Sequence, residues 1–252
     1  EEFDPLLLKA LIIHSAKYPD GYNIPNDERT KYSGFGIPQT VPEILYNSPN
    51  EVSLILRDIL PKGQFIDIKD FPMPDCLVKN GFYTGQIIVT LVYDPILEVS
   101  QGFEYCQSNM DIRLGSYNEK CERDISKNNI LNPIGRSQAK NLLNGSLYSK
   151  IKMRENEQSF AKLERMLIQH GDKYYPVKKF AVDLDELTDG NKLKYITSDK
   201  QWYLTINGSY RNFIEERASN EGLALGQEFC AIITIRDPNK TEDVYSGVTQ
   251  KL

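Results

Sequence analysis

The stretch Gln86-Ile-Ile-Val-Thr-Leu-Val-Tyr93 decides the fold class. It is dominated by β-branched and aromatic residues, which favour an extended strand. Apolar side chains stand at both odd and even positions, as expected of a strand that is buried on both faces. We therefore predict an inner strand that lies between two packed layers.

Strand-like runs of similar composition lie on both sides of this stretch. They span Glu51–Arg57, Gln64–Lys69, Glu104–Leu114, Val177–Leu184, Gln201–Asn207 and Glu228–Arg236. Turn-forming residues separate the runs, at Pro61-Lys-Gly63, Asn80-Gly81, Asp94-Pro95, Asn207-Gly208 and Asp237-Pro238. Seven or more strands without alternating helices predict a mainly β fold, an antiparallel β-sandwich of jelly-roll type.

A helix is predicted over residues 5–17. Asp4 suits the N-cap position and Pro5 the first turn. Apolar residues fall on nearly every side of this helix, which is typical of a helix in the middle of a large domain. The loop that follows carries Gly34-Phe-Gly36, interpreted as a turn. We expect the packing partners of the helix to precede residue 1.

The strand pattern stops between about residues 118 and 175, which indicates an insertion. One helix is predicted inside it, over Glu157–His170, with Phe160, Leu163 and Leu167 on one face and Gly171 as its stop. The segment has four more basic than acidic residues. This charge is expected to be a solvated face, or alternatively a docking surface for an acidic partner.

Composition excludes several classes of protein. The chain has 252 residues, of which 40% are apolar and 26% charged, enough for a globular core. Its net charge of -5 gives no attraction toward nucleic acid. Apolar runs stay far below the roughly 20 residues of a membrane helix, and Glu1-Glu2-Phe3-Asp4 is no signal peptide. We expect no membrane partner and a cytoplasmic location.

The metal-binding residue types are sparse. Cys76, Cys106, Cys121 and Cys230 form no C-x-x-C motif, and only two histidines occur, so no zinc site is predicted. The cysteines are interpreted as reduced thiols, or alternatively as one or two disulfides. The acidic stretch Asp183–Asn191 fails the spacing of an EF-hand. It is interpreted as a turn between strands, or alternatively as a cation site.

The chain also lacks a recognisable catalytic group. His14 and Ser15 are adjacent in the predicted helix, so they point about 100° apart and form no dyad. His14 is expected to be a packed or interface histidine, and His170 to cap the end of the second helix. No G-x-S-x-G motif occurs. Three glycosylation sequons, at Asn144, Asn207 and Asn239, would matter only in a secreted eukaryotic chain.

Two motifs near the start resemble the closing segment of the subtilisin-like serine peptidase domain. Lys9-Ala-Leu-Ile12 with Ser15-Ala16 is similar to the family's late helix, K-A-L-L-x-x-[ST]-A. Gly34-Phe-Gly36 is similar to its G-[YF]-G motif, in the right order. The resemblance covers about residues 5–46. The segments Gly81–Pro95 and Phe229–Pro238 also resemble the β-rich extension of certain large bacterial subtilases.

The resemblance implies that this is the C-terminal part of a subtilisin-like endopeptidase. Residues 1–46 would be a helical remnant of the α/β catalytic domain, and residues 47–252 a β-sandwich domain. The family's Asp, His, Asn and Gly-Thr-Ser motifs all precede this segment, so no catalytic, cofactor or metal residue is assigned and the chain alone should be inactive. The sandwich would stabilise the catalytic domain, or engage substrate or a protein or peptide partner.

Two other functions are kept open. One is a free-standing β-sandwich module that binds carbohydrate or protein, favoured by the fifteen tyrosines. The other is hydrolysis by the chain itself, which the search for a triad disfavours. Finally, unless the first helix docks on the sandwich or on a second copy, it is expected to expose an apolar patch and cause self-association.

Overall fold

Antiparallel sheets dominate the computed structural model, which describes residues 4–19, 33–40, 48–117, 140–149, 166–170 and 174–252. One sheet has the strand order β1 (Glu51–Pro61), β11 (Gly226–Arg236), β5 (Gln86–Tyr93), β9 (Tyr174–Asp183), β8 (Met166–His170). The second has the order β2 (Phe65–Lys69), β10 (Gln201–Tyr210), β6 (Ser108–Tyr117), β7 (Lys140–Asn141). A small hairpin pairs β3 (Val78–Lys79) with β4 (Phe82–Tyr83). The predicted mainly β fold is confirmed.

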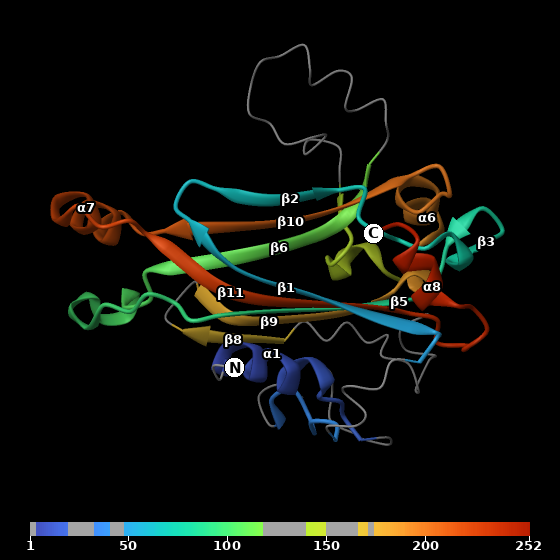
Figure 1. Cartoon of the computed structure of the whole chain (residues 1–252), viewed down its shortest axis with the longest axis horizontal. Helices are drawn as coiled ribbons and strands as arrows, with labels where there is room; N and C mark the ends of the chain where they lie inside the picture. Colours follow the sequence, from blue (N-terminus) through green and yellow to red (C-terminus); the bar gives the residue numbers. More distant parts are fainter. Residues whose placement is uncertain (1–3, 20–32, 41–47, 118–139, 150–165, 171–173) are drawn as a thin grey trace, which may run out of the picture.

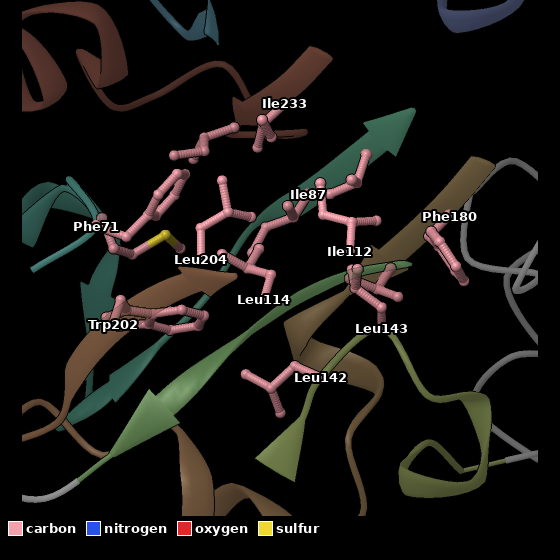
Figure 2. Packing of buried hydrophobic residues seen from close by; sticks show 14 of the residues in the cluster. Phe71, Ile87, Ile112, Leu114, Leu142, Leu143, Phe180, Trp202, Leu204 and Ile233 are labelled. Atoms are coloured by element: carbon pink, nitrogen blue, oxygen red, sulfur yellow. The ribbon is translucent and has the colours of Figure 1, made fainter. Parts of the chain in front are cut away.

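The two large sheets lie one above the other and share a core (Figure 1). All eight residues of β5 are buried, as its sequence predicts, because β5 is the middle strand of its sheet and both of its faces are covered. Side chains from both sheets meet between the layers (Figure 2). The core includes Ile87 of β5, Ile233 of β11, Ile112 and Leu114 of β6, and Trp202 and Leu204 of β10.

Helices lie at both ends of the sheets and below one of them (Figure 1). They are α1 (Pro5–Ser15), α6 (Asp189–Tyr195), α7 (Asn212–Glu221) and α8 (Val244–Thr249), with 3-10 turns η1 (Asp75–Leu77), η2 (Val99–Glu104), η3 (Gly145–Leu147) and η4 (Leu184–Glu186). Helices α6, α7 and α8 were not predicted from the sequence. The signal for α7 was present, since Gly222 ends it in the left-handed conformation with φ +67°.

The predicted first helix is confirmed as α1, with Asp4 as its N-cap. Asp4 Oδ1 accepts hydrogen bonds from the backbone of Leu6 and Leu7, at 2.9 and 3.0 Å. The helix packs on the outer face of the five-stranded sheet, where Leu6 and Ala10 join a cluster with Val92, Val177, Cys230 and Ile232. The expectation that its packing partners precede residue 1 is therefore wrong for this face. The outer side of β5 and β11 is itself apolar there, and it covers the helix.

The opposite side of α1 stays open. Leu8 and Ile12 are 44% and 41% exposed. Self-association was expected unless the first helix docks on the sandwich. One face of the helix does dock on the sheet, while the other face still presents apolar side chains to solvent.

Two predictions inside the insertion are wrong where the structure describes it. Residues 166–170 form strand β8, paired with β9, and not the end of a helix over 157–170; residues 157–165 lie outside the described residues. Strands β7 and β8 also lie within residues 118–175, where the strand pattern was expected to stop. The edge of β9 offers backbone pairing to the run Met166–His170, and this pairing overrides its local helical spacing.

The pair Asn207-Gly208 is not a turn. Both residues lie within β10, where Asn207 pairs with Phe65 on one side and Asp111 on the other. Pairing with two neighbouring strands outweighs the local turn preference of the Asn-Gly pair. The turns at Asn80-Gly81, Pro61–Gly63 and Asp237-Pro238 are confirmed. Among the described residues, no helix has the length and apolar character needed to cross a membrane.

Candidate functional site

A polar cleft opens at one end of the five-stranded sheet. It lies where β5 begins and where β9 and β11 end, and the β3–β4 hairpin and α6 complete its walls. Its volume is about 290 Å³. The lining residues are Lys79, Asn80, Phe82, Thr84, Gly85, Asp185, Lys192, Asp237, Pro238 and Asn239.

A polar network fixes the three strand ends next to this cleft. Gln86 lies opposite Asp183 on one side and Arg236 on the other. Its amide donates to Asp183 Oδ2 at 3.0 Å, while its carbonyl accepts from Arg236 Nε and Nη2 at 2.9 and 2.7 Å. Burial raises the pKa of the Asp183 carboxyl and lowers the pKa of the Arg236 guanidinium. One amide side chain thus holds both charged neighbours in register.

Glycines shape the hairpin wall. Asn80 and Gly81 both have positive φ, of +54° and +82°, as a two-residue type I′ turn requires. Gly85 has φ +96°, and a Cβ there would lie 2.9 Å from the Arg236 carbonyl oxygen and 3.2 Å from Leu77. Only glycine allows this close approach between the start of β5 and the end of β11.

The Asp237 carboxylate is occupied by hydrogen bonds from its own turn. Its carboxylate accepts from the backbone of Asn239 at 3.0 Å, of Thr241 at 2.8 Å and of Glu242 at 3.0 Å, and from the Thr241 hydroxyl at 2.8 Å. Burial alone would favour the neutral form, but the hydrogen bonds from Thr241 and its neighbours lower the pKa of Asp237. This side chain therefore builds the wall and has little capacity left for a ligand.

The two lysines of the cleft keep unused donors. Lys79 Nζ lies 3.4 Å from Glu242 Oε1, and Lys192 Nζ lies 3.9 Å from Asp185 Oδ1. Within the described part of the chain neither ammonium makes a hydrogen bond, and the same holds for the side-chain amides of Asn80 and Asn239. Four side chains from three separate segments thus bring polar groups without a hydrogen bond, two of them in ion pairs, to one cavity.

A second polar cluster joins α1 to the sheet. His14 Nδ1 lies 2.8 Å from Thr90 Oγ1, and His14 Nε2 lies 2.7 Å from Thr234 Oγ1. Burial, with the charges of Lys179 and Arg236, lowers the pKa of His14 to about 3. The imidazole is therefore neutral at pH 7, and both of its nitrogens are engaged. This confirms the interpretation of His14 as a packed histidine.

Lysine and aspartate hold the two ends of the same helix. Lys179 Nζ donates to the carbonyl oxygens of Ile13 at 2.9 Å and Ala16 at 2.6 Å, which lie at the C-terminal end of α1. At the other end, Asp4 Oδ2 lies 2.6 Å from Arg57 Nε of β1. Cationic charge at a helix C-terminus and anionic charge at its N-terminus both stabilise it. The helix is thus fastened to the sheet at both ends.

The other residues singled out in the sequence do not form a catalytic group. Ser15 Oγ donates to the Ile12 carbonyl at 3.0 Å, so it is not directed at His14. His170 lies in strand β8, and its interpretation as a helix cap is wrong. Asp183 accepts from the backbone of Asp185, and Asp189 begins α6. Among the described residues, no three His, Cys, Asp or Glu side chains gather as metal ligands.

The cysteines that the structure describes form no disulfide, and the three sequons differ in their surroundings. Cys76, Cys106 and Cys230 are free thiols, and Cys121 lies outside the described residues. Asn144 and Asn239 are exposed, whereas Asn207 belongs to strand β10.

Sequence reasoning did not find the cleft itself. The turns at Asn80-Gly81 and Asp237-Pro238 were recognised, but nothing in the sequence shows that they meet beside α6. Comparison with known proteins adds no family: no protein-family model, curated protein or solved structure matches the chain.

Proposed function

We propose that this chain is the C-terminal region of a subtilisin-like serine endopeptidase, and that its two sheets form a β-sandwich of jelly-roll type that holds the end of the catalytic domain. The observation that carries the proposal is the set of specific polar contacts that attach α1 to the sheet. The helix with the K-A-L-I motif is capped, ion-paired and hydrogen-bonded to three strands, through Asp4, His14 and Lys179.

The second motif supports the same proposal. Lys17 and Ile37 exchange backbone hydrogen bonds of 2.9 and 2.8 Å, which tie the end of α1 to the Gly34-Phe-Gly36 turn. Gly36 has φ +88°, and a Cβ there would lie 2.4 Å from the Lys17 carbonyl oxygen. Gly36 is therefore a steric requirement of this loop, whereas Gly34 has a positive φ but no atom within 4 Å of an added Cβ.

The exposed side of α1 fits the proposed parent protein. In such a protein Leu8 and Ile12, each more than 40% exposed in this chain, would pack against the preceding catalytic domain. Proteolysis would be carried out there: a serine attacks the carbonyl, a histidine acts as base, an aspartate orients it and an asparagine stabilises the oxyanion. In this chain His14 and Ser15 are engaged elsewhere and supply none of these roles.

Labelling with a fluorophosphonate probe tests the proposal. We expect no labelling of the 252-residue chain, and labelling of the product of the complete reading frame at a serine before Glu1. Labelling of the isolated chain, or none of the complete product, would contradict it.

A second candidate function is a free-standing module that binds carbohydrate or protein. The polar cleft favours it, because its lysines are held only by exposed ion pairs and its lining is independent of any catalytic domain. Binding of the isolated chain on a glycan array or in a pull-down would support this candidate.

A further inference from the structure

We propose that the cleft between the β3–β4 hairpin, α6 and the end of β11 binds a peptide through a carboxylate group. This inference is independent of the protease assignment, because it uses only residues of the cleft. Its volume of about 290 Å³ is just below the range of small-ligand sites, roughly 300–1,000 Å³, and suits one or two residues of a peptide.

The lining carries two lysines and two aspartates, and the donors of its lysines and asparagines are the groups that would bind a carboxylate. Lys79 and Lys192 each carry an ammonium group without a hydrogen bond among the described residues, and Asn80 and Asn239 add amide donors. Charge-assisted hydrogen bonds from ammonium groups to a carboxylate are short and strong. A ligand rich in acceptors satisfies these donors better than one rich in donors.

The carboxylates of the wall do not fill this role. Both carboxylate oxygens of Asp237 accept hydrogen bonds from the turn over residues 238–242. Asp185 has a side chain 53% exposed and lies 3.9 Å from Lys192, beyond hydrogen-bond distance. Glu242 holds Lys79 at 3.4 Å in an equally open setting. Such exposed pairs contribute little stability, so a ligand carboxylate can replace them.

The cleft also offers an apolar surface beside the charges. Phe82 is half-buried and lines the cavity, and Pro238 also belongs to the lining. A peptide that places its carboxylate between Lys79 and Lys192 can therefore lay an adjoining side chain or backbone against the Phe82 ring. Capture of a terminal carboxylate is a known mode of peptide recognition.

Titration calorimetry on the full 252-residue chain tests the proposal. Three peptide probes are used: an acetylated uncharged hexapeptide with a free C-terminus, the same peptide amidated, and an amidated version with one internal aspartate. Binding of the first alone identifies a terminal carboxylate, and binding of the third identifies an acidic side chain. Equal binding of the neutral amidated peptide, or no binding of any of the three at millimolar concentration, would overturn the proposal.

Variants on one helix provide the matched control. Lys192→Gln is expected to weaken binding about ten-fold, the loss of one charge-assisted hydrogen bond. Lys194→Gln, on the same helix but outside the lining, should leave affinity unchanged. Thermal unfolding monitored by circular dichroism verifies that both variants fold. Equal effects of the two substitutions would refute the site.

A substitution that is expected to strengthen binding distinguishes a carboxylate ligand from a neutral one. Asp185→Asn removes the group that competes for Lys192, so it should tighten carboxylate binding several-fold. A saccharide held through hydrogen bonds to Asp185 would instead bind more weakly in this variant. Weaker binding of the acidic peptides to Asp185→Asn would contradict the proposal. Raising the salt concentration should weaken binding of these peptides to the wild type, because salt screens the attraction between the lysines and the carboxylate.

Discussion

His14 gives the fold a pH dependence that can be calculated from one residue. Its pKa is about 3 in the folded chain against 6.5 for an ordinary histidine, so between these values the unfolded chain binds more protons. The stability that the neutral imidazole contributes is complete above pH 6.5 and falls as the pH drops toward 3.

We predict a loss of about 2 kcal/mol in the free energy of unfolding between pH 6.5 and pH 5 from this residue. His14→Gln should be less stable at pH 7 but show a shallower decline, as measured by urea unfolding across this range. If wild type and variant lost stability in parallel, His14 would not be the group that titrates.

Gly85 is a second residue at which the structure makes a sharp prediction. Gly85→Ala should destabilise the chain by about 2 kcal/mol or more, because it combines a strained φ with a Cβ 2.9 Å from the Arg236 carbonyl oxygen. Gly81→Ala is the control, since its φ is also positive but no atom lies within 4 Å of the added Cβ. Chemical denaturation compares them, and an equal cost for both would show that the close approach does not matter.

At the scale of elements, the docking of α1 is the feature most open to test. Ala10 is fully buried in the cluster with Val92, Cys230 and Ile232. Ala10→Asp should release the helix, since an unpaired carboxylate costs several kcal/mol in an apolar contact. We expect hydrogen exchange of the α1 amides to become fast, while β5 and β11 stay protected.

Leu8→Asp is the matched control, because Leu8 lies on the exposed side of the same helix. Its α1 amides should remain as protected as in the wild type. Rapid exchange of α1 in the unsubstituted chain would contradict the docking itself.

The elements that the sequence predicted well are those with a strong local pattern. Strand β5 matches its predicted range, Gln86–Tyr93, because β-branched residues on both faces leave no other buried conformation. Helix α1 was found through its N-cap, Asp4. The errors at Asn207-Gly208 and at Met166–His170 have a common cause: pairing with a neighbouring strand, which no local pattern records, decided the conformation.

At the scale of the whole molecule, the sequence could not show which segments meet. The face of β5 and β11 that covers α1 carries Val92, Cys230 and Ile232. From the sequence alone, these apolar residues cannot be distinguished from residues of the core between the sheets. The cleft joins a hairpin, a helix and a turn, and more than 100 residues separate Lys79 of the hairpin from Lys192 of the helix. Individual turns were predictable, but their meeting depends on the strand order β1-β11-β5-β9-β8.

We propose that α1 and the Gly34-Phe-Gly36 turn are the end of a subtilisin-like catalytic domain that the sheets hold in place. Sequencing the reading frame immediately upstream of Glu1 tests it most directly. We expect a continuous frame that encodes a Gly-Thr-Ser nucleophile motif and, further upstream, a histidine in a His-Gly-Thr context. An upstream frame without the Gly-Thr-Ser motif would contradict it.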